Sequence, residues 1–247
     1  MNPATLTYTR YELLRTLRNR RFFFLSLGFP LVLYLLIVSP QRHIQDFDLT
    51  GLSVALYFMV GMASFGTMSA MLSSGARISA ERQAGWNRQL RITPLPPRAY
   101  FRTKVLTGYM MASISLLTLF VAGAAMGVSL PADKWIEMTL LILVGLIPFA
   151  AGGILLGHLL TPDSIGPAIG GLIALLALLG GSWGPVAGHG FLHGLAQLLP
   201  SYWLVQAGHV AAGGRAWSAE GWIVIAVWTV VLAWLAQRAY RRDTGRV

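Results

Sequence analysis

The chain has 247 residues, of which 55% are hydrophobic and 11% are charged, and its mean hydropathy is +0.61. This composition excludes a soluble globular protein, so residues 1–247 are expected to form one integral membrane domain without a large soluble module. The formal net charge of +10 would suggest a nucleic-acid partner in a soluble protein. Here no such partner is expected, because the basic residues lie where membrane topology places them.

The first element in chain order is a basic, amphipathic segment over residues 2–21. If this segment is helical, its leucines gather on one side, and Glu12, Arg15 and Arg18 lie on the opposite side. We therefore expect a helix in the membrane interface, with its leucines in lipid and with Arg10, Arg15 and Arg18 among the headgroups of the membrane lipids. A basic flank of the first span, without a role of its own, is the alternative interpretation.

After this segment come apolar runs of roughly 18 to 26 residues, which suffice to cross a hydrocarbon core about 30 Å thick. We therefore expect an all-α fold with six transmembrane helices. Their approximate positions are residues 22–38, 49–74, 105–128, 135–160, 164–184 and 219–237. Residues 185–216 are Gly-rich, with apolar pieces too short to cross, which predicts one or two short extracellular helices between the fifth and sixth spans.

The distribution of basic residues predicts the orientation. Sixteen of the nineteen arginines and lysines lie in the N-terminal arm, in residues 76–104 or in the C-terminal tail, and the alternate loops hold only Arg42, Lys134 and Arg215. The positive-inside rule therefore places both termini and residues 76–104 in the cytoplasm. With no N-x-S/T sequon and no cleavable signal peptide in the sequence, we expect an uncleaved multi-pass protein of a bacterial inner membrane.

Residues 76–104, between the second and third spans, hold seven of the basic residues. We predict a helix over residues 77–92, in which Arg77, Glu81 and Arg88 share one face. Prolines follow this segment and end the helix. A charged surface helix between two spans is typical of a docking element for a soluble partner.

The sequence lacks the motifs of an ATP-binding or catalytic chain. It contains no G-x-x-x-x-G-K-[ST] phosphate loop, no H-E-x-x-H or G-x-S-x-G motif and no cysteine. The mid-span regions are almost free of the ionisable side chains that mark ion-coupled carriers and intramembrane enzymes. His189 and His193 are four residues apart, but without a third ligand no metal site is expected. The energy for any transport must then come from a partner.

The stretch between the second and third spans also carries a recognisable pattern. Its members are Glu81, Arg82, Gly85, Leu90, Thr93 and Pro94. They are similar to the pattern E-R-x-x-G-x-x-x-x-L-x-x-T-P of ABC-2-type transporter permeases, the type-V exporter fold of the daunorubicin-type drug-resistance permeases. The resemblance extends over nearly the whole chain, because the interfacial helix, the six spans and the short outer helices also agree.

The resemblance implies that residues 77–92 form a coupling helix that enters a cleft on a separate ATP-binding subunit, with Glu81 and Arg88 as its main charged contacts. The residues expected to couple the chain to that subunit are Arg77, Glu81, Arg82, Gly85, Trp86, Arg88, Leu90, Thr93 and Pro94. Two ATP-binding subunits, which would hold ATP and Mg, would serve two permease chains, most simply a homodimer. The first, second and fifth spans would surround the path, and the permease itself would bind no cofactor.

Small residues suggest where helices approach one another and where a path could open. Gly180 and Gly181, with Trp183 beside them near the outer end of the fifth span, are candidates for an exit gate. Glycines four residues apart permit close helix packing. Such pairs include Gly153 with Gly157 and Gly166 with Gly170.

These features together predict a transport subunit, not an enzyme: the permease of an ATP-driven exporter for an amphipathic or hydrophobic cargo, such as a drug or a lipid-like molecule. Two other classes remain open. A scaffolding membrane protein would have no ATP-binding partner. An intramembrane lipid-modifying enzyme would need clustered polar residues at one membrane face, and the histidines of residues 185–216 are the only candidates for such a site.

Overall fold

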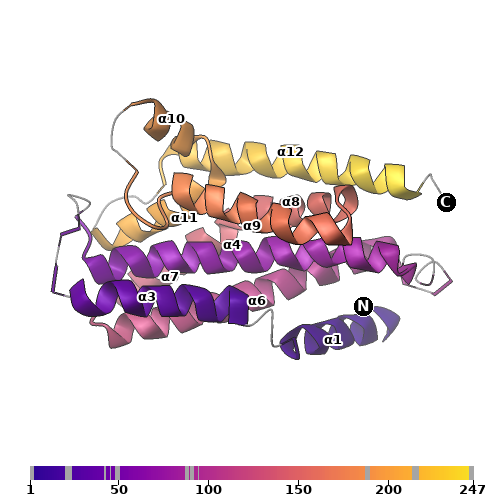
Figure 1. The fold of residues 1–247 in the computed structure, drawn as a ribbon, viewed down its shortest axis with the longest axis horizontal. Helices are drawn as coiled ribbons and strands as arrows, with labels where there is room; N and C mark the ends of the chain where they lie inside the picture. Colours follow the sequence, from indigo (N-terminus) through magenta and orange to yellow (C-terminus); the bar gives the residue numbers. More distant parts are fainter. Residues whose placement is uncertain are drawn as a thin grey trace.

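The computed structural model describes residues 3–19, 24–41, 43–44, 46–47, 51–86, 89, 92–93, 95–186, 190–212 and 217–244. Over these residues the chain is all-helical, as predicted, and its long helices run side by side (Figure 1). α1 (Pro3–Leu17) and the C-terminal end of α12 (Ala219–Thr244) lie at the same end of the bundle (Figure 1). We call this end the termini end and the other the opposite end.

Five of the six predicted spans are helices long and apolar enough to cross a membrane. They are α4 (Val54–Gln83), α6 (Pro97–Ala125), α7 with α8 (Ala132–Gly145 and Ile147–Leu159), α9 (Pro162–Leu179) and α12. The predicted first span is a shorter apolar helix, Ser26–Gln41, built from η1 (Phe24–Gly28), α3 (Phe29–Val38) and η2 (Ser39–Gln41). Pro148 lies in the first turn of α8, where a proline without an N–H is tolerated, and this explains the division of the fourth span.

α4 is the centre of the bundle. Its N-terminus is capped by Ser53, whose hydroxyl accepts the N–H of Leu56 at 3.3 Å. The most apolar 18-residue window of α4 is completely buried, mainly against α3, α6, α8, α9 and α11 (Pro200–Gln206). This window is therefore enclosed by its own chain, and the expectation that the second span borders a path between two chains stays a prediction.

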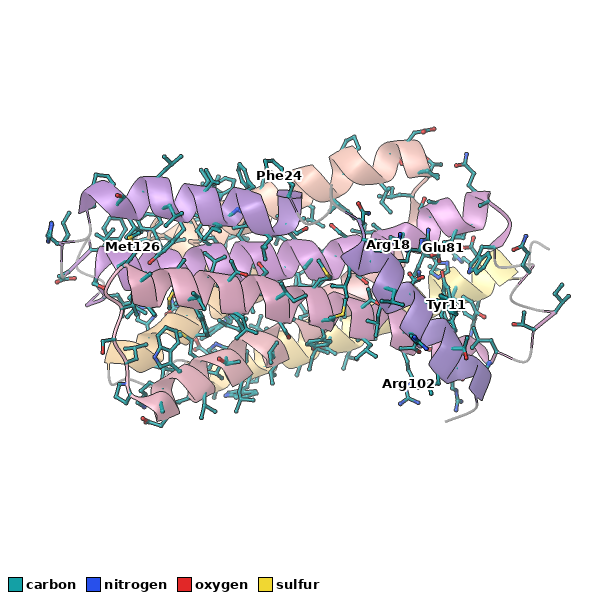
Figure 2. The ribbon with its side chains drawn as sticks, turned by 90° about the horizontal axis from the view of Figure 1, so that it is seen from below. Tyr11, Arg18, Phe24, Glu81, Arg102 and Met126 are labelled. Carbon is teal, nitrogen blue, oxygen red and sulfur yellow. The ribbon has the colours of Figure 1, made fainter. Side chains whose placement is uncertain are left out.

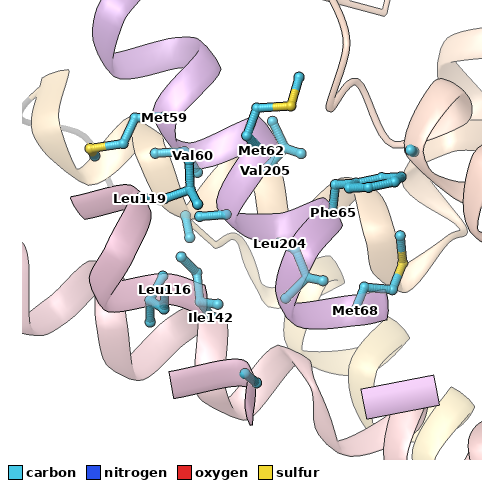
Figure 3. Close-up of a cluster of buried hydrophobic side chains, with 14 of the residues drawn as sticks. Met59, Val60, Met62, Phe65, Met68, Leu116, Leu119, Ile142, Leu204 and Val205 are labelled. Carbon is cyan, nitrogen blue, oxygen red and sulfur yellow. The ribbon is translucent and has the colours of Figure 1, made fainter. Parts of the chain in front are cut away.

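Methionine side chains of α4 fill much of this core. Figure 3 shows Met59, Met62 and Met68 in a cluster with Leu116 and Ile142 from neighbouring helices. Each of the three methionines is at most 1% exposed. An unbranched thioether adapts to irregular gaps between helices, so these methionines are packing residues of the core.

Short helices cover the opposite end, as predicted for residues 185–216. They are α10 (Phe191–Gln197), α11 (Pro200–Gln206) and η3 (Ala207–Ala212). The indole N–H of Trp203, on α11, donates to the carbonyl of Gln197 at 2.8 Å, and the indole N–H of Trp217 donates to the carbonyl of Trp203 at 2.6 Å. Both indoles are buried. These hydrogen bonds hold α11 in the space between the ends of the long helices.

α4 and α8 cross in direct backbone contact. A Cβ on Gly75 would overlap the backbone of Gly153, and a Cβ on Gly157 would overlap the carbonyl of Gly75. The structure thus confirms that the spacing of Gly153 and Gly157 lets two helices approach closely. Gly166 and Gly170, on α9, instead face open space, because no atom lies within 4 Å of an added Cβ.

This crossing makes a prediction about stability. Gly75→Ala is expected to lower the free energy of unfolding by about 1–3 kcal/mol, the usual cost of overpacking a close-packed interior. Gly194→Ala is the matched control, since it adds the same methyl group to a helical glycine of α10 with space around it. Thermal unfolding of the purified chain in detergent measures both. Equal midpoints for the two variants would contradict the backbone contact.

Candidate functional site

The predicted coupling stretch begins inside α4. This helix continues through Gln83, so that residues 77–83 form its last two turns, and its cap Ala84 is followed by Gly85 at φ +70°. A residue in the left-handed region commonly ends an α-helix, and glycine adopts this conformation without strain. The predicted single helix over residues 77–92 is therefore interrupted at Gly85.

Beyond Gly85, the described residues of the stretch are exposed. Trp86 and Thr93 are exposed, and the side chain of Ile92 is 88% exposed. Three further residues of the predicted contact set, Arg88, Leu90 and Pro94, lie outside the described residues.

Glu81, predicted as a surface contact, lies in a buried ion cluster. Its Oε1 is 2.6 Å from Nζ of Lys104, which is also 2.7 Å from Oε1 of Glu12 on α1. Tyr100 donates its hydroxyl to Oε2 of Glu81 at 2.6 Å. Glu12 and Glu81 are 5% exposed, and Lys104 is 1% exposed. Figure 2 shows Glu81 beside α1, so this charged face of α4 is not the solvated surface that the sequence suggested.

The cluster places three cations around its two buried carboxylates. Two carboxylates share the ammonium of Lys104, and Nη1 of Arg15 lies 3.5 Å from Glu81 and 3.7 Å from Glu12. Arg77 adds a second guanidinium, which donates to a threonine hydroxyl of α1 at 2.5 Å. Removing one partner of a buried ion pair leaves an uncompensated charge and costs about 3–5 kcal/mol. The packing of α1, α4 and α6 against one another therefore depends on the ion pairs of Lys104.

Arg82, the next residue of the motif, points to the other side of α4. Its Nε and Nη2 lie 2.7 Å from the two carboxylate oxygens of Asp243 on α12. Its Nη1 donates to the carbonyls of Gly157 and His158, in the last turn of α8, at 3.1 and 2.7 Å. Nδ1 of His158 lies 2.7 Å from Oδ2 of Asp243. This geometry needs the planar fork of an arginine, because a lysine could not pair with the carboxylate and cap both carbonyls.

Glu81 and Arg82 thus connect the end of α4 to four other helices. Neighbouring residues of a helix are separated by about 100°, so Glu81 faces α1 and α6 while Arg82 faces α8 and α12. Five members of these two clusters were not predicted as site residues: Glu12, Tyr100, Lys104, His158 and Asp243. One signal was present in the sequence, because Pro97 is a typical first residue of a helix. A helix starting there places Lys104 inside a span, where a lysine needs a partner.

α1 is attached to the bundle by a polar stripe. Thr9, Glu12 and Thr16 are buried, and Oγ1 of Thr9 lies 2.9 Å from Oγ1 of Thr103 on α6. Burial, with Glu12 nearby, raises the pKa of the Tyr8 phenol above its ordinary value. The exposed residues of α1 include Leu6, Leu14 and Leu17 together with Arg10, Arg15 and Arg18. Leucines facing outward suit an interfacial helix, whereas Glu12, which was expected on the polar face with Arg15 and Arg18, points into the protein.

The predicted gate residues lie at the C-terminal end of α9, at the opposite end. Gly181 has φ +80°, and its carbonyl accepts the hydroxyl of Tyr57 at 2.5 Å. Gly180 packs so closely against Ser201 of α11 that a Cβ would overlap it. Trp183 is 38% exposed, and its ring lies 5.8 Å from a phenylalanine ring of α4. The three residues form a tight packing turn, and their role as a gate stays a prediction.

The histidines of the opposite end do not form a metal site in the part of the chain that the structure describes. His193 pairs with Gln197 at 3.0 Å, one turn along α10. His189 lies outside the described residues. No group of three histidines or carboxylates among the described residues is placed to hold a metal ion.

Comparison with known proteins gives the family of the chain. Residues 41–238 match the family described as "ABC-2 family transporter protein". The chain belongs to this ABC-2 family. The protein named "Putative transport permease YvfS" of Bacillus subtilis (strain 168) is 29% identical over 195 residues, which cover 77% of this chain and 78% of that relative. The ABC-2 permease is thus a multi-pass membrane protein and the membrane component of a transporter.

Family membership removes two alternatives. ABC-2 permeases are transport subunits without a catalytic domain, and they typically pair with ATP-binding subunits, so neither the lipid-modifying enzyme nor the scaffolding protein is retained. The matched region contains Glu81, Arg82 and Lys104 but neither Glu12 nor Asp243. The two carboxylates that complete the clusters therefore come from outside that region.

The two lysines of this ABC-2 permease allow a matched test of the buried cluster. Lys104→Met is expected to lower the free energy of unfolding by about 3–5 kcal/mol, because two buried carboxylates lose their shared cation. The ion pair of Lys134 with Glu137, at 3.1 Å, is partly exposed, so Lys134→Met is expected to cost at most about 1 kcal/mol. Thermal unfolding in detergent compares the variants.

Adding Glu12→Gln to Lys104→Met should recover part of the lost stability, since it removes one of the two carboxylates left without the shared cation. The cluster would be shown not to hold α1 if the single and double variants unfolded at the same temperature as Lys134→Met.

Proposed function

We propose that this ABC-2 permease is the membrane subunit of an ATP-driven exporter and that residues 84–96 receive the motion of a separate ATP-binding subunit. The observation that carries the proposal is the position of Glu81 and Arg82, which directly precede this stretch and bind four other helices. A displacement of the stretch therefore acts on α1, α6, α8 and α12 together. A coupling element needs this property, whereas a passive loop does not.

Contact with the ATP-binding subunit is assigned to the exposed part of the stretch. Trp86, Ile92 and Thr93 present their side chains to the surroundings. Glu81 and Arg82 are occupied by internal partners, so their role in coupling is to transmit motion to the other helices. Arg88, Leu90 and Pro94, from the contact set expected from the sequence, complete this proposed surface, and the left-handed turn at Gly85 separates its described residues from α4.

The continuous α4 helix supports a rigid-body mechanism. ATP-driven closure of two motor subunits would push residues 84–96 toward the membrane. Because α4 is one helix of 30 residues whose apolar part is buried among its neighbours, the push would shift the packed spans together. The two permease chains would then separate at the opposite end, with Gly180, Gly181 and Trp183 beside the exit.

The outer face of α9 supports pairing with a second permease chain. Gly166 and Gly170 have open space around them, and only 22% of the most apolar window of α9 is buried. Glycines at this spacing let a second helix approach closely. A homodimer served by two ATP-binding subunits, which hold ATP and Mg, is the simplest assembly. The sparse charge of the spans favours an amphipathic or hydrophobic cargo, such as a drug or a lipid-like molecule.

The termini end faces the cytoplasm of a bacterium in this proposal. Sixteen of the nineteen basic residues belong to the N-terminal arm, residues 76–104 and the C-terminal tail, and the described parts of these three segments meet at this end. The positive-inside rule associates such segments with the cytoplasmic side of the inner membrane, and the matched relative is bacterial. This orientation puts residues 84–96 where ATP is available.

The proposed partner can be sought directly. A tagged chain purified gently from its native membrane is expected to bring with it a stoichiometric protein that contains a phosphate-binding P-loop, identified by mass spectrometry. The complex is expected to hydrolyse ATP. A preparation without any ATPase, even after chemical cross-linking, would contradict ATP-driven coupling.

Substitutions at two exposed isoleucines distinguish loss of docking to the ATP-binding subunit from the general effect of a new surface charge. Ile92→Glu is expected to weaken retention of the ATP-binding subunit about tenfold, the equivalent of about 1.4 kcal/mol, without changing the unfolding midpoint of the isolated chain. Ile44→Glu is the matched control, since this exposed isoleucine lies in the loop at the opposite end.

Glu81→Lys should instead lower the unfolding midpoint, because it places two ammonium groups in one buried cluster. The opposite result would be loss of the ATP-binding subunit from Glu81→Lys at an unchanged unfolding midpoint, with normal retention of the subunit by Ile92→Glu. That result would show that Glu81 contacts the subunit directly.

A further inference from the structure

A cavity at the termini end borders the coupling stretch only at Pro96 and is otherwise lined by other helices. Its volume is about 620 Å³, within the range of about 300–1,000 Å³ that small-molecule sites usually have. It lies between α6, α8 and α12, and its walls are mostly apolar, with Phe101, Ala151, Ile154 and Ala236 among them. Ala233, also in the wall, is exposed on α12, so the cavity opens to the surroundings of the bundle.

The two charged residues of the cavity wall are gathered at one end of the cavity, which we call its mouth. Arg98 is in the first turn of α6 and Arg241 is in the last turns of α12, so both guanidinium groups lie at the termini end. From Arg241 to Ala233 the wall extends eight residues along the helix, or about 12 Å toward the middle of the span. Among the described residues, no carboxylate lines the cavity and none forms an ion pair with Arg98. The site is therefore cationic at the mouth and apolar in its depth.

The inner wall of this cavity is shared with the Arg82 cluster. The rings of Phe101 and Tyr240 are 4.9 Å apart in an edge-to-face contact, and each lies against His158, at 6.0 and 5.6 Å. His158 in turn pairs with Asp243. A molecule in the cavity would therefore touch the aromatic side chains that pack against the link between α4, α8 and α12.

We propose that this cavity binds one anionic phospholipid from the leaflet on the side of the termini, with its phosphate at Arg98 and Arg241 and an acyl chain between α6, α8 and α12. A phospholipid fits because it combines an anionic headgroup with an apolar tail in the order that the cavity offers. A soluble anion would leave the apolar depth empty. The inference depends on the chain being a membrane protein and not on the ATP-driven coupling proposed above.

Lipid binding to the full-length chain, purified with whatever subunit accompanies it and stripped of lipid in detergent, tests the proposal. Dioleoylphosphatidylglycerol is the anionic probe, dioleoylphosphatidylcholine is the zwitterionic one, and inorganic phosphate represents a free anion. Native mass spectrometry counts the bound lipids, and thermal unfolding reports stabilisation. The first molecule of the anionic lipid is expected to bind tighter than the zwitterionic lipid and to raise the unfolding midpoint.

Two pairs of variants show whether binding occurs at this site. Arg98→Gln is expected to weaken the first binding step about fivefold, which matches about 1 kcal/mol for each basic residue near a lipid surface. Arg102→Gln, an exposed arginine one turn further along α6 and outside the cavity wall, should leave that step unchanged. Ala233→Phe fills the cavity and should abolish the first step, whereas Ala226→Phe, on another exposed alanine of α12, should not.

Several outcomes would overturn the proposal. Equal effects of Arg98→Gln and Arg102→Gln would show general attraction of lipid to a basic surface. Stabilisation by inorganic phosphate alone, or its competition with the lipid, would show a free-anion site. If Ala233→Phe left lipid binding unchanged and instead lost a protein that copurifies with the chain, this result would show that a segment of that protein fills the cavity. Arg98→Gln keeps the test valid if Ala233→Phe fails to fold, because the substituted side chain is exposed.

Discussion

Lys104 cannot be buried without partners, and satisfying its charge determines how the termini end is built. An ammonium group removed from water needs carboxylates around it, and Lys104 finds one on α1 and another on α4. These contacts bring three helices together and hold α1 against the bundle and against the charged end of α4. Arg82 extends the same construction to α8 and α12. A permease with an apolar interior thus concentrates its buried charges at one end.

The termini end therefore combines a fixed interior with two surfaces of different chemistry. The exposed stretch after Gly85 mixes apolar side chains such as Ile92 with polar ones and lies beyond the spans, whereas the cavity between α6 and α12 has mostly apolar walls and opens beside them. The Arg82 cluster lies between the two, because it begins at the end of α4 and reaches the aromatic wall of the cavity. A protein partner and a membrane component can in this way act on the same set of helices from different directions.

The spans could be predicted from the sequence because a run of about 20 apolar residues is a local signal. The helix ends at the termini end could not. The predicted second span stopped at Ser74, where charges begin, but α4 continues to Gln83 because those charges are paired inside the protein. Glu12 and Lys104 are 92 residues apart, and a contact between residues so far apart produces no periodic pattern in the sequence. Amphipathic analysis found the polar face of α1, yet only the tertiary structure shows that Glu12 meets another helix.

The glycine contact between α4 and α8 gives α4 the properties of a lever. Backbone touches backbone at Gly75 with no side chain between, so this crossing is a natural fulcrum. Glu81 lies six residues from it on one side and Tyr57 eighteen on the other, which makes the arms about 9 Å and about 27 Å long. A sideways displacement of a rigid α4 at Glu81 would therefore produce an opposite displacement about three times larger at Tyr57, where the helix is bonded to the turn at Gly181.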